Sequence, residues 1–208
     1  MSATQRPRTR LDPEVRREQI VAAAERVFNG RDPAEVTFEE IAEAAGVSRA
    51  LVYNYFGDRG GIIAAVYLRS LRRLDEELDR AVEPTATDAE RLHSVVRCYL
   101  RFARENASAW RLIGTTATMD HPEVLQARRD RFDQLARNWG DTAEARIAAR
   151  AVVGFLESAT LDWIETRDLD LERIADLLFT ILWTGLSAVD RGEARVPRGR
   201  PTAHASQG

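Results

Sequence analysis

Three polar side chains in the segment 37–56 offer the chemistry of molecular recognition. Arg49, Tyr53 and Asn54 follow Ser48 at a spacing that places them on the outward face of one short helix. A guanidinium group can pair bidentately with O6 and N7 of guanine, whereas hydroxyl and amide groups contact phosphates or base edges. These residue types therefore point to nucleic-acid recognition.

Two short helices and a glycine turn are predicted to position these side chains. Thr37 is a suitable N-cap, and Glu40 three residues later completes a capping box. Gly46 stands where the first helix must end in a left-handed conformation, and Ser48 caps the second helix. This arrangement is the helix-turn-helix plan for entering a DNA major groove.

Residues 14 to about 74 resemble the DNA-binding domain of TetR-type (TetR/AcrR) transcriptional regulators. The resemblance is carried by Arg17, Ile20, Ala23, Ala24, Val27, Phe28, Thr37-Phe38, Ile41-Ala42, Ala45-Gly46-Val47-Ser48 and Leu51-Val52-Tyr53-Asn54-Tyr55-Phe56. Arg59 stands where this family usually has a lysine. The resemblance implies an all-α fold, in which an N-terminal three-helix helix-turn-helix domain precedes a C-terminal helical bundle for effector binding and dimerisation.

The candidate DNA-binding residues are Thr37, Ser48, Arg49, Ala50, Tyr53, Asn54, Tyr55 and Arg59. For Arg49, contact with a base and contact with a phosphate are both open. The resemblance implies that Tyr53 contacts the DNA backbone or a thymine methyl, although a packing role within the head is the alternative. Thr37 starts a helix whose N-terminus attracts phosphate. Arg6, Arg8 and Arg10 form a basic arm that either reaches a minor groove or merely solubilises the chain.

Composition is that of a soluble chain and excludes several other classes. Of 208 residues, 44% are hydrophobic and 30% charged, the net charge is −3, and all 30 basic residues are arginine. Cys98 is the only cysteine, which excludes an intrachain disulfide, and the three histidines lack metal-ligand spacing. No signal peptide or membrane-spanning run is evident, so we expect a cytoplasmic protein with no cofactor, no metal and no membrane partner.

Helical spacing recurs along the chain and predicts about nine helices and no sheet. We expect the DNA-binding domain over residues 12–74, the effector-binding and dimerisation domain over 75–190, and disorder over 1–11 and 191–208. Long helices are expected over about 59–82, 88–105, 122–138, 142–167 and 171–190, and a short one around 109–116. Gly60 and Gly61 depart from the family pattern and should weaken the start of the helix that joins the two domains, by roughly 1 kcal/mol each.

The body contains candidates for an apolar effector pocket and for a dimer interface. The pocket candidates are His93, Arg97, Tyr99, Phe102, Trp110, Met119, Phe132, Phe155 and Trp163. The interface candidates are Ala151, Phe155, Ser158, Leu178, Leu182, Trp183 and Leu186, from two helices that would form a four-helix bundle with a second copy. Ordinary core packing is the alternative for both sets.

These observations favour a dimeric repressor that binds a pseudo-palindromic double-stranded DNA operator and is released by a small, largely apolar effector. A DNA-binding activator, or a protein-interaction module without an effector, is the second hypothesis. An all-helical enzyme acting on an apolar substrate is the third. It has little support, because the sequence lacks a nucleophile elbow, a phosphate loop, a dinucleotide fingerprint and a zinc-protease motif, and no catalytic residue is assigned.

Overall fold

The computed structural model describes residues 12–29, 31, 35–107, 110 and 120–190. Within these ranges the regular structure is helical, without strands, which confirms the predicted all-α class. The helices are α1 (Pro13–Phe28), α2 (Phe38–Ala45), α3 (Arg49–Phe56), α4 (Arg59–Ala81), α5 (Asp88–Glu105), α8 (Pro122–Asn138), α9 (Ala143–Thr166) and α10 (Leu171–Asp190). Both chain ends, the arginines expected to form an arm, Met119 and nearly all of the short helix expected at 109–116 lie outside the described residues.

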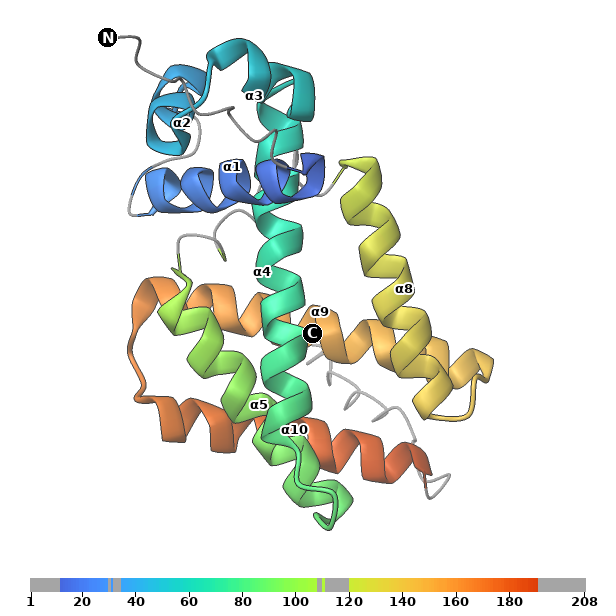
Figure 1. Ribbon diagram of the computed structural model, residues 1–208. Coiled ribbons are helices and arrows are strands. Elements are labelled where there is room, and N and C mark those ends of the chain that lie inside the picture. Colours follow the sequence, from blue (N-terminus) through green and yellow to red (C-terminus); the bar gives the residue numbers. More distant parts are fainter. Residues whose placement is uncertain (1–11, 30, 32–34, 108–109, 111–119, 191–208) are drawn as a thin grey trace, which may run out of the picture.

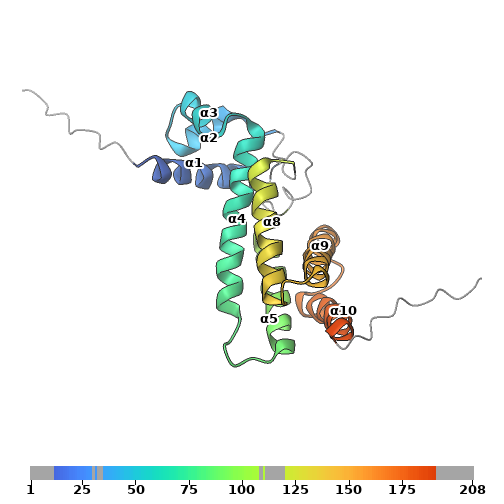
Figure 2. The same ribbon diagram turned by 90° about the vertical axis from the view of Figure 1, so that its right-hand side faces the viewer.

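The long helix α4 connects a small head to a larger body. Helices α1, α2 and α3 gather around its N-terminal end, whereas α5, α8, α9 and α10 lie alongside the rest of its length (Figure 1). Turned by 90°, the molecule shows α4 and α8 side by side, with α9 and α10 on the far side of α8 (Figure 2). No helix in the described part combines the length and the apolar character needed to cross a membrane.

Side-chain caps set the starts of several helices. The Asp12 carboxylate accepts a hydrogen bond from the backbone N–H of Glu14 at 2.8 Å. The Thr142 hydroxyl accepts from the N–H of Ala145 at 3.1 Å, at the start of α9. Each cap satisfies a donor that the first turn leaves without an intrahelical partner. The expected helix limits therefore agree with the structure to within a few residues.

Helix α2 starts with the predicted capping box. The Thr37 hydroxyl accepts from the N–H of Glu40 at 3.2 Å, and the Glu40 carboxylate accepts from the N–H of Thr37 at 2.8 Å. Arg31 donates to the same carboxylate at 2.7 Å. The hydrogen bond from the Thr37 backbone, together with the one from Arg31, lowers the pKa of Glu40 from 4.5 to about 2. The ionised form of Glu40 is therefore part of the folded head.

Helix α4 contributes to two separate hydrophobic cores. Ile62 and Val66, both fully buried, pack with α1, α2 and α3 in the core of the head. Tyr67 and Leu74 pack with α5, α9 and α10 in the core of the body. Because one helix carries side chains of both cores, the packing of α4 ties the head to the body.

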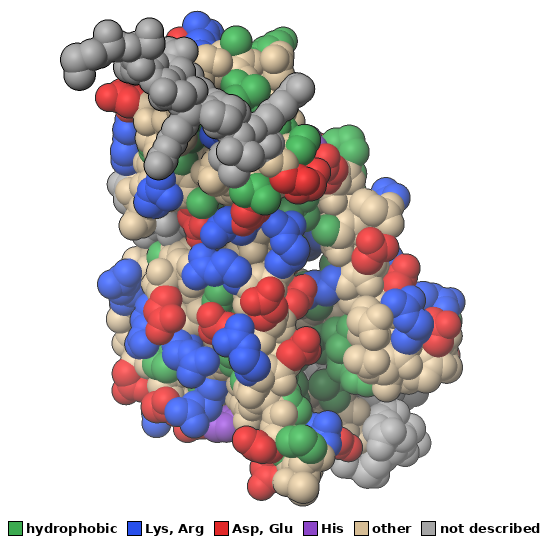
Figure 3. Space-filling model, viewed as in Figure 1, with side chains coloured by type: hydrophobic (Ala, Val, Ile, Leu, Met, Phe, Trp, Pro, Cys, Tyr) green, Lys and Arg blue, Asp and Glu red, His purple; other side chains and the backbone are tan. Residues whose placement is uncertain are grey.

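Ion pairs tie α1 to α4 where the head meets the body. Arg69 pairs with Glu18 and, through Nε at 3.0 Å, with Glu25. Arg73 also pairs with Glu25 at 2.8 Å. Figure 3 shows arginine and acidic side chains interspersed over this face of the molecule. The junction therefore combines shared apolar packing with a charged surface network.

Of the two glycines at the start of α4, Gly61 has a steric role that the sequence did not reveal. A Cβ atom at position 61 would lie 2.1 Å from the carbonyl oxygen of Phe56, which is fixed backbone. At position 60 the nearest atom is the flexible Asp58 carboxylate, at 3.2 Å. Gly61 thus permits the close approach of α3 and α4, whereas Gly60 is not required for it.

We predict that Gly61→Ala destabilises the protein by about 1–3 kcal/mol, because the added methyl group overpacks against fixed backbone. The matched variant Gly60→Ala should stay within about 1 kcal/mol of the native chain, since alanine is the better helix former. Thermal unfolding followed by circular dichroism measures both. Equal melting temperatures for the two variants would contradict the steric role of Gly61.

The stabilising effect of Glu40 should disappear in acid. Because its pKa is lower in the folded than in the unfolded state, its contribution is complete above about pH 4.5 and is lost as the pH falls to about 2. We therefore predict that Glu40→Gln lowers the melting temperature near neutral pH, and that the difference from the native chain shrinks across this window. Glu43→Gln, at an exposed carboxylate of α2 outside the cap, is the control. A difference independent of pH would contradict the prediction.

Candidate nucleic-acid interface

The turn between α2 and α3 has the geometry expected of a helix-turn-helix. Gly46 adopts a left-handed conformation with φ of 66°, and the N–H of Val47 donates to the carbonyl of Ala42 at 2.9 Å. The Ser48 hydroxyl then accepts from the N–H of Leu51 at 3.2 Å. Glycine is suited to this position because a positive φ costs it little. The turn sets the angle between α2 and α3 (Figure 1).

Helix α3 presents one polar face to solvent and packs the other into the head. Val52 and Phe56 are buried in the head core. The opposite side exposes residues predicted to meet DNA, namely Arg49, Ala50, Tyr53 and Asn54, with Tyr53 61% exposed. Tyr55 is half-buried and packs against the head core, so its ring has a structural role. The major groove of DNA is wide enough to admit one α-helix, so α3 can enter it with this face toward the bases.

Arg49 forms an ion pair that the sequence did not reveal. Its guanidinium lies 2.7 Å from the carboxylate of Glu39 on α2, and both side chains are largely exposed. An exposed pair of this kind contributes at most about 1 kcal/mol, so a base or phosphate can replace it. Ten residues separate the partners in sequence, and only the turn between the helices brings them together. Glu39 is thus an additional residue at the candidate interface.

Two other candidates lie at helix starts. The backbone N–H and the hydroxyl of Thr37 are both hydrogen-bonded to Glu40, at 2.8 and 3.0 Å. A phosphate at this helix start would therefore have to use the next N–H groups of α2. Arg59 is exposed in the first turn of α4, close in sequence to the end of α3.

Three of the aromatic residues predicted to line an effector pocket come together in the body core. The Trp110 ring contacts those of Tyr99 and Phe102 edge-on, with centroid separations of 5.0 and 6.0 Å. All three are buried, and burial raises the pKa of the Tyr99 hydroxyl well above 10. A fourth aromatic candidate, Trp163, donates a hydrogen bond from Nε1 to the backbone carbonyl of Leu169 at 2.8 Å.

The remaining pocket candidates have other partners. His93 and Arg97 on α5 reach carboxylates of α10: His93 lies 3.0 Å from Asp176, and Arg97 lies 2.8 Å from Glu172. Phe132 lies below the guanidinium groups of two arginines, and Phe155 is half-buried beside the body core. The structure thus groups Tyr99, Phe102 and Trp110 in the core. It places His93 and Arg97 at the surface, where α5 meets α10.

Two hollows formed by described residues lie away from that aromatic group. One is a groove of about 430 Å³ between α4 and α8. The other, of about 200 Å³, lies beside the end of α9 and is lined in part by the pocket candidate Trp163. Tyr99, Phe102 and Trp110 are buried together in the body core, away from both of these hollows.

The interface candidates of α10 require a correction. Leu178 and Leu182 are buried in the chain's own body core, so their side chains cannot cover a second copy. The neighbouring positions face outward instead: Leu177 is 47% exposed and Ile181 48%. The sequence shows apolar residues on more than one face of this helix, and packing against α5 decides which face turns inward. Trp183 is also partly exposed, and Leu186 is half-buried.

The interface candidates of α9 show a similar division. Ala151, Gly154 and Ser158 recur at helical spacing and are exposed, forming a flat strip of small side chains. Phe155 lies beside this strip and is half-buried. In Figure 2, α9 and α10 lie next to each other on the side of the body away from α4. The exposed faces of the two helices can therefore contribute to one surface.

Arg17 is a further residue whose position the sequence did not reveal. Its guanidinium lies over the ring of Phe56, at 5.4 Å from the centroid, where α3 ends. The same group lies 3.8 Å from the Glu123 carboxylate in the first turn of α8. Arg17 thus connects the candidate DNA-reading helix to a helix of the body.

Both parts of the chain match known sequence families. The profile described as "Bacterial regulatory proteins, tetR family" matches residues 20–66, and that of the "Tetracyclin repressor-like, C-terminal domain" matches residues 89–185. An HTH-type transcriptional regulator of Mycobacterium tuberculosis is 40% identical over 99 residues, a match that spans 47% of this chain and 49% of that protein. The chain thus aligns with only about half the length of this relative.

Two longer matches extend over head and body together. The HTH-type transcriptional activator FasR of Mycolicibacterium smegmatis is 27% identical over 86% of this chain and 87% of its own. A crystal structure of a tetR-family transcriptional regulator from Streptomyces coelicolor is similar with a TM-score of 0.65 and 28% identity, covering 88% of this chain and 86% of that one. Together with the helix-turn-helix geometry, these matches show that the chain belongs to the TetR family of bacterial transcriptional regulators.

Proposed function

We propose that this chain binds double-stranded DNA as a homodimer and regulates transcription in response to a small molecule. The observation that carries the proposal is the exposed face of α3, where Arg49, Tyr53 and Asn54 project from a helix that the Gly46 turn holds rigidly. Residues 12–74 would form the DNA-binding domain, and residues 75–190 the effector-binding and dimerisation domain. The basic groups of Arg49 and Arg59 supply charge for bases or phosphates.

The exposed apolar side chains of α10 support dimerisation. Leu177 and Ile181 are one turn apart and about half exposed, and the neighbouring helix α9 also exposes a strip of small residues. A helical patch of this kind is suited to packing against its own copy about a twofold axis. Pairing two heads lets the protein read two half-sites, which raises both affinity and the length of DNA recognised.

Repression with release by an effector is the proposed mode of action. The effector would favour a head spacing that no longer matches successive major grooves, and it must bind the two arrangements with different affinity. Activation is the second candidate, because FasR, the relative matched over most of both chains, is named an activator. An enzymatic function is not favoured, since the relatives are named as transcriptional regulators.

Selection from a randomised pool of DNA duplexes tests the proposal directly. The full chain should enrich a pseudo-palindromic sequence, and fluorescence anisotropy should show that scrambled duplex competes poorly for it. Placing the enriched sequence upstream of a reporter then separates repression from activation by the direction of the change. Enrichment of no sequence, or equal binding to scrambled DNA, would contradict a sequence-specific regulator.

Arg49→Ala should weaken binding to the enriched duplex by about 1–3 kcal/mol, because a bidentate pair with guanine is lost. Arg49→Lys keeps the charge but not the planar pair of donors, so it should also weaken binding and relax the base preference at that position. Arg137→Ala, at an exposed arginine of the body, is the control. Unchanged affinity and base preference in both Arg49 variants would refute direct readout, whereas loss in the alanine variant alone would indicate a phosphate contact.

Ile181→Asp should dissociate the dimer. Burial of an aliphatic side chain contributes roughly 1.5–3 kcal/mol, and the twofold arrangement removes it from both copies, so we expect the dissociation constant to rise at least about tenfold. Sedimentation velocity at several concentrations measures this change. Leu125→Asp introduces the same charge at a comparably exposed apolar residue of α8 and serves as the control. An unaltered dimer in the Ile181 variant would place the interface elsewhere.

A further inference from the structure

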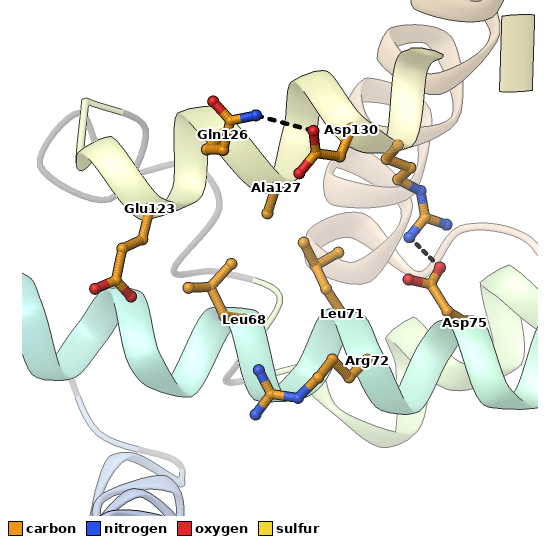
Figure 4. Close-up of a pocket in the computed structure, with 9 residues that line it drawn as sticks. Leu68, Leu71, Arg72, Asp75, Glu123, Gln126, Ala127 and Asp130 are labelled. Atoms are coloured by element: carbon orange, nitrogen blue, oxygen red, sulfur yellow. Dashed lines mark hydrogen bonds and ion pairs between the residues drawn. The ribbon is translucent and has the colours of Figure 1, made fainter. Parts of the chain in front are cut away.

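The groove between α4 and α8 is built from one face of each helix. Leu68 and Leu71 on α4 face Ala127 on α8 and form an apolar floor (Figure 4). Glu123 and Asp130, one turn before and one turn after Ala127, stand on the same face of α8. The volume of about 430 Å³ lies within the range of small-molecule sites. The groove therefore pairs an apolar surface with carboxylates at both ends.

The charges in this groove are not balanced. Asp75 is paired with Arg131, so these two charges cancel. Arg72 is directed to Glu18 of the head, at 3.8 Å. In the part of the chain that the structure describes, Asp130 accepts a hydrogen bond only from the neutral amide of Gln126, at 2.9 Å. Among the described residues, this negative charge beside an apolar floor thus lacks a cationic partner.

The carboxylate at the other end of the groove is connected to the head. Glu123 contacts Arg17 of α1 at 3.8 Å, and the Arg17 guanidinium lies over the Phe56 ring at the end of α3. Arg72, which also lines the groove, pairs with Glu18. Glu123 and Arg72 therefore both have their partners on α1. A molecule that engages Glu123 competes with a contact between body and head.

We propose that the α4–α8 groove binds a small amphipathic cation, and that the bound cation weakens the Glu123–Arg17 contact that helps to hold the head. The apolar part of the molecule covers Leu68, Leu71 and Ala127, and its positive group lies between the carboxylates of Glu123 and Asp130. This inference rests on the proposed function, and deepens it by assigning the charge of the effector and a site outside the aromatic core. The carboxylates of Glu123 and Asp130 repel an anion of the same shape, while Arg72 and Arg131 in the lining are already paired with Glu18 and Asp75.

The occupied groove changes the head through the arginine that it displaces. Arg17 released from Glu123 is free to leave the Phe56 ring, which removes one restraint on the C-terminal end of α3. The cation binds more tightly to the arrangement in which Glu123 is free, so it shifts the population toward that arrangement. By reciprocity, DNA that favours the restrained head weakens binding of the cation.

Isothermal titration calorimetry on the full chain without DNA tests the site. The probes are octyltrimethylammonium, below its micelle-forming concentration, and octanoate as the anion of equal chain length. We expect saturable binding of one octyltrimethylammonium per chain and none of octanoate. Glu123→Gln and Asp130→Asn should each weaken binding by about threefold to fivefold, since exposed charge pairs contribute up to about 1 kcal/mol. Asp133→Asn, at an exposed carboxylate of α8 outside the groove, should have no effect.

Absence of saturable binding, equal binding of octanoate, or equal weakening by Asp133→Asn would overturn the site. Ala127→Phe fills the groove without changing charge, and should abolish binding while leaving the helical content intact. Binding that persists in this variant would also overturn it. These outcomes do not depend on DNA, so they are distinguishable from a failure of the proposed function.

The coupling is tested with the duplex enriched from the randomised pool. Octyltrimethylammonium should raise the dissociation constant for this duplex by about fivefold or more in the native chain, and octanoate should not. Arg17→Gln, which lacks the contact to be displaced, should show a smaller effect than the native chain while still binding the cation. An undiminished effect in Arg17→Gln, or no effect of a bound cation on DNA affinity, would overturn the coupling. If no duplex is enriched, the proposed function fails and the calorimetry still decides the site.

Discussion

The sharing of α4 between two hydrophobic cores is the constraint on which the rest of the structure depends. Ile62 and Val66 belong to the head, whereas Tyr67 and Leu74 belong to the body, and a single uninterrupted helix carries all of them. The head cannot turn about α4 without disturbing close packing, which is costly in protein interiors. Movement of the head must therefore accompany movement of α4 or a change in the contacts at its surface.

The surface contacts at the junction are of a different kind from the cores. Arg69 and Arg73 link α4 to Glu18 and Glu25 of α1, and Arg17 links α1 to α8. Individual exposed ion pairs are weak and exchange readily with other partners. The apolar cores thus set which elements move together, while the charged contacts set how easily the arrangement shifts. This division of roles is compatible with a regulator whose response depends on small differences in free energy.

Much of the fold was predictable from local signals in the sequence. Thr37 and Ser48 cap their helices where expected, and Gly46 adopts the left-handed turn, because each of these features depends on only a few neighbouring residues. The packed face of α10 was not predictable in the same way. Its apolar residues surround the helix, and only the position of α5 determines that Leu178 turns inward while Leu177 turns outward.

The candidate sites show the same limit. The face of α3 followed from helical spacing, but the pairing of Arg49 with Glu39 requires the angle between α2 and α3. The contact of Arg17 with Glu123 joins residues more than a hundred positions apart, and no periodicity indicates it. Gly61 appeared from its sequence to weaken a helix, whereas the Phe56 carbonyl makes a larger residue the greater problem. Long-range geometry, rather than residue type, decides each of these points.

The exclusive use of arginine at the junction has a consequence for how DNA binding is measured. Guanidinium groups stay protonated at every pH that a protein tolerates, so the ties between α1, α4 and α8 respond to dissolved ions far more than to alkali. The affinity of a protein for DNA also falls as the salt concentration rises, because cations compete with the protein for the phosphates. A plot of the logarithm of affinity against that of salt concentration would then contain two contributions, one from the phosphates and one from the loosening of the head. The number of phosphate contacts counted from its slope would exceed the number that the protein makes.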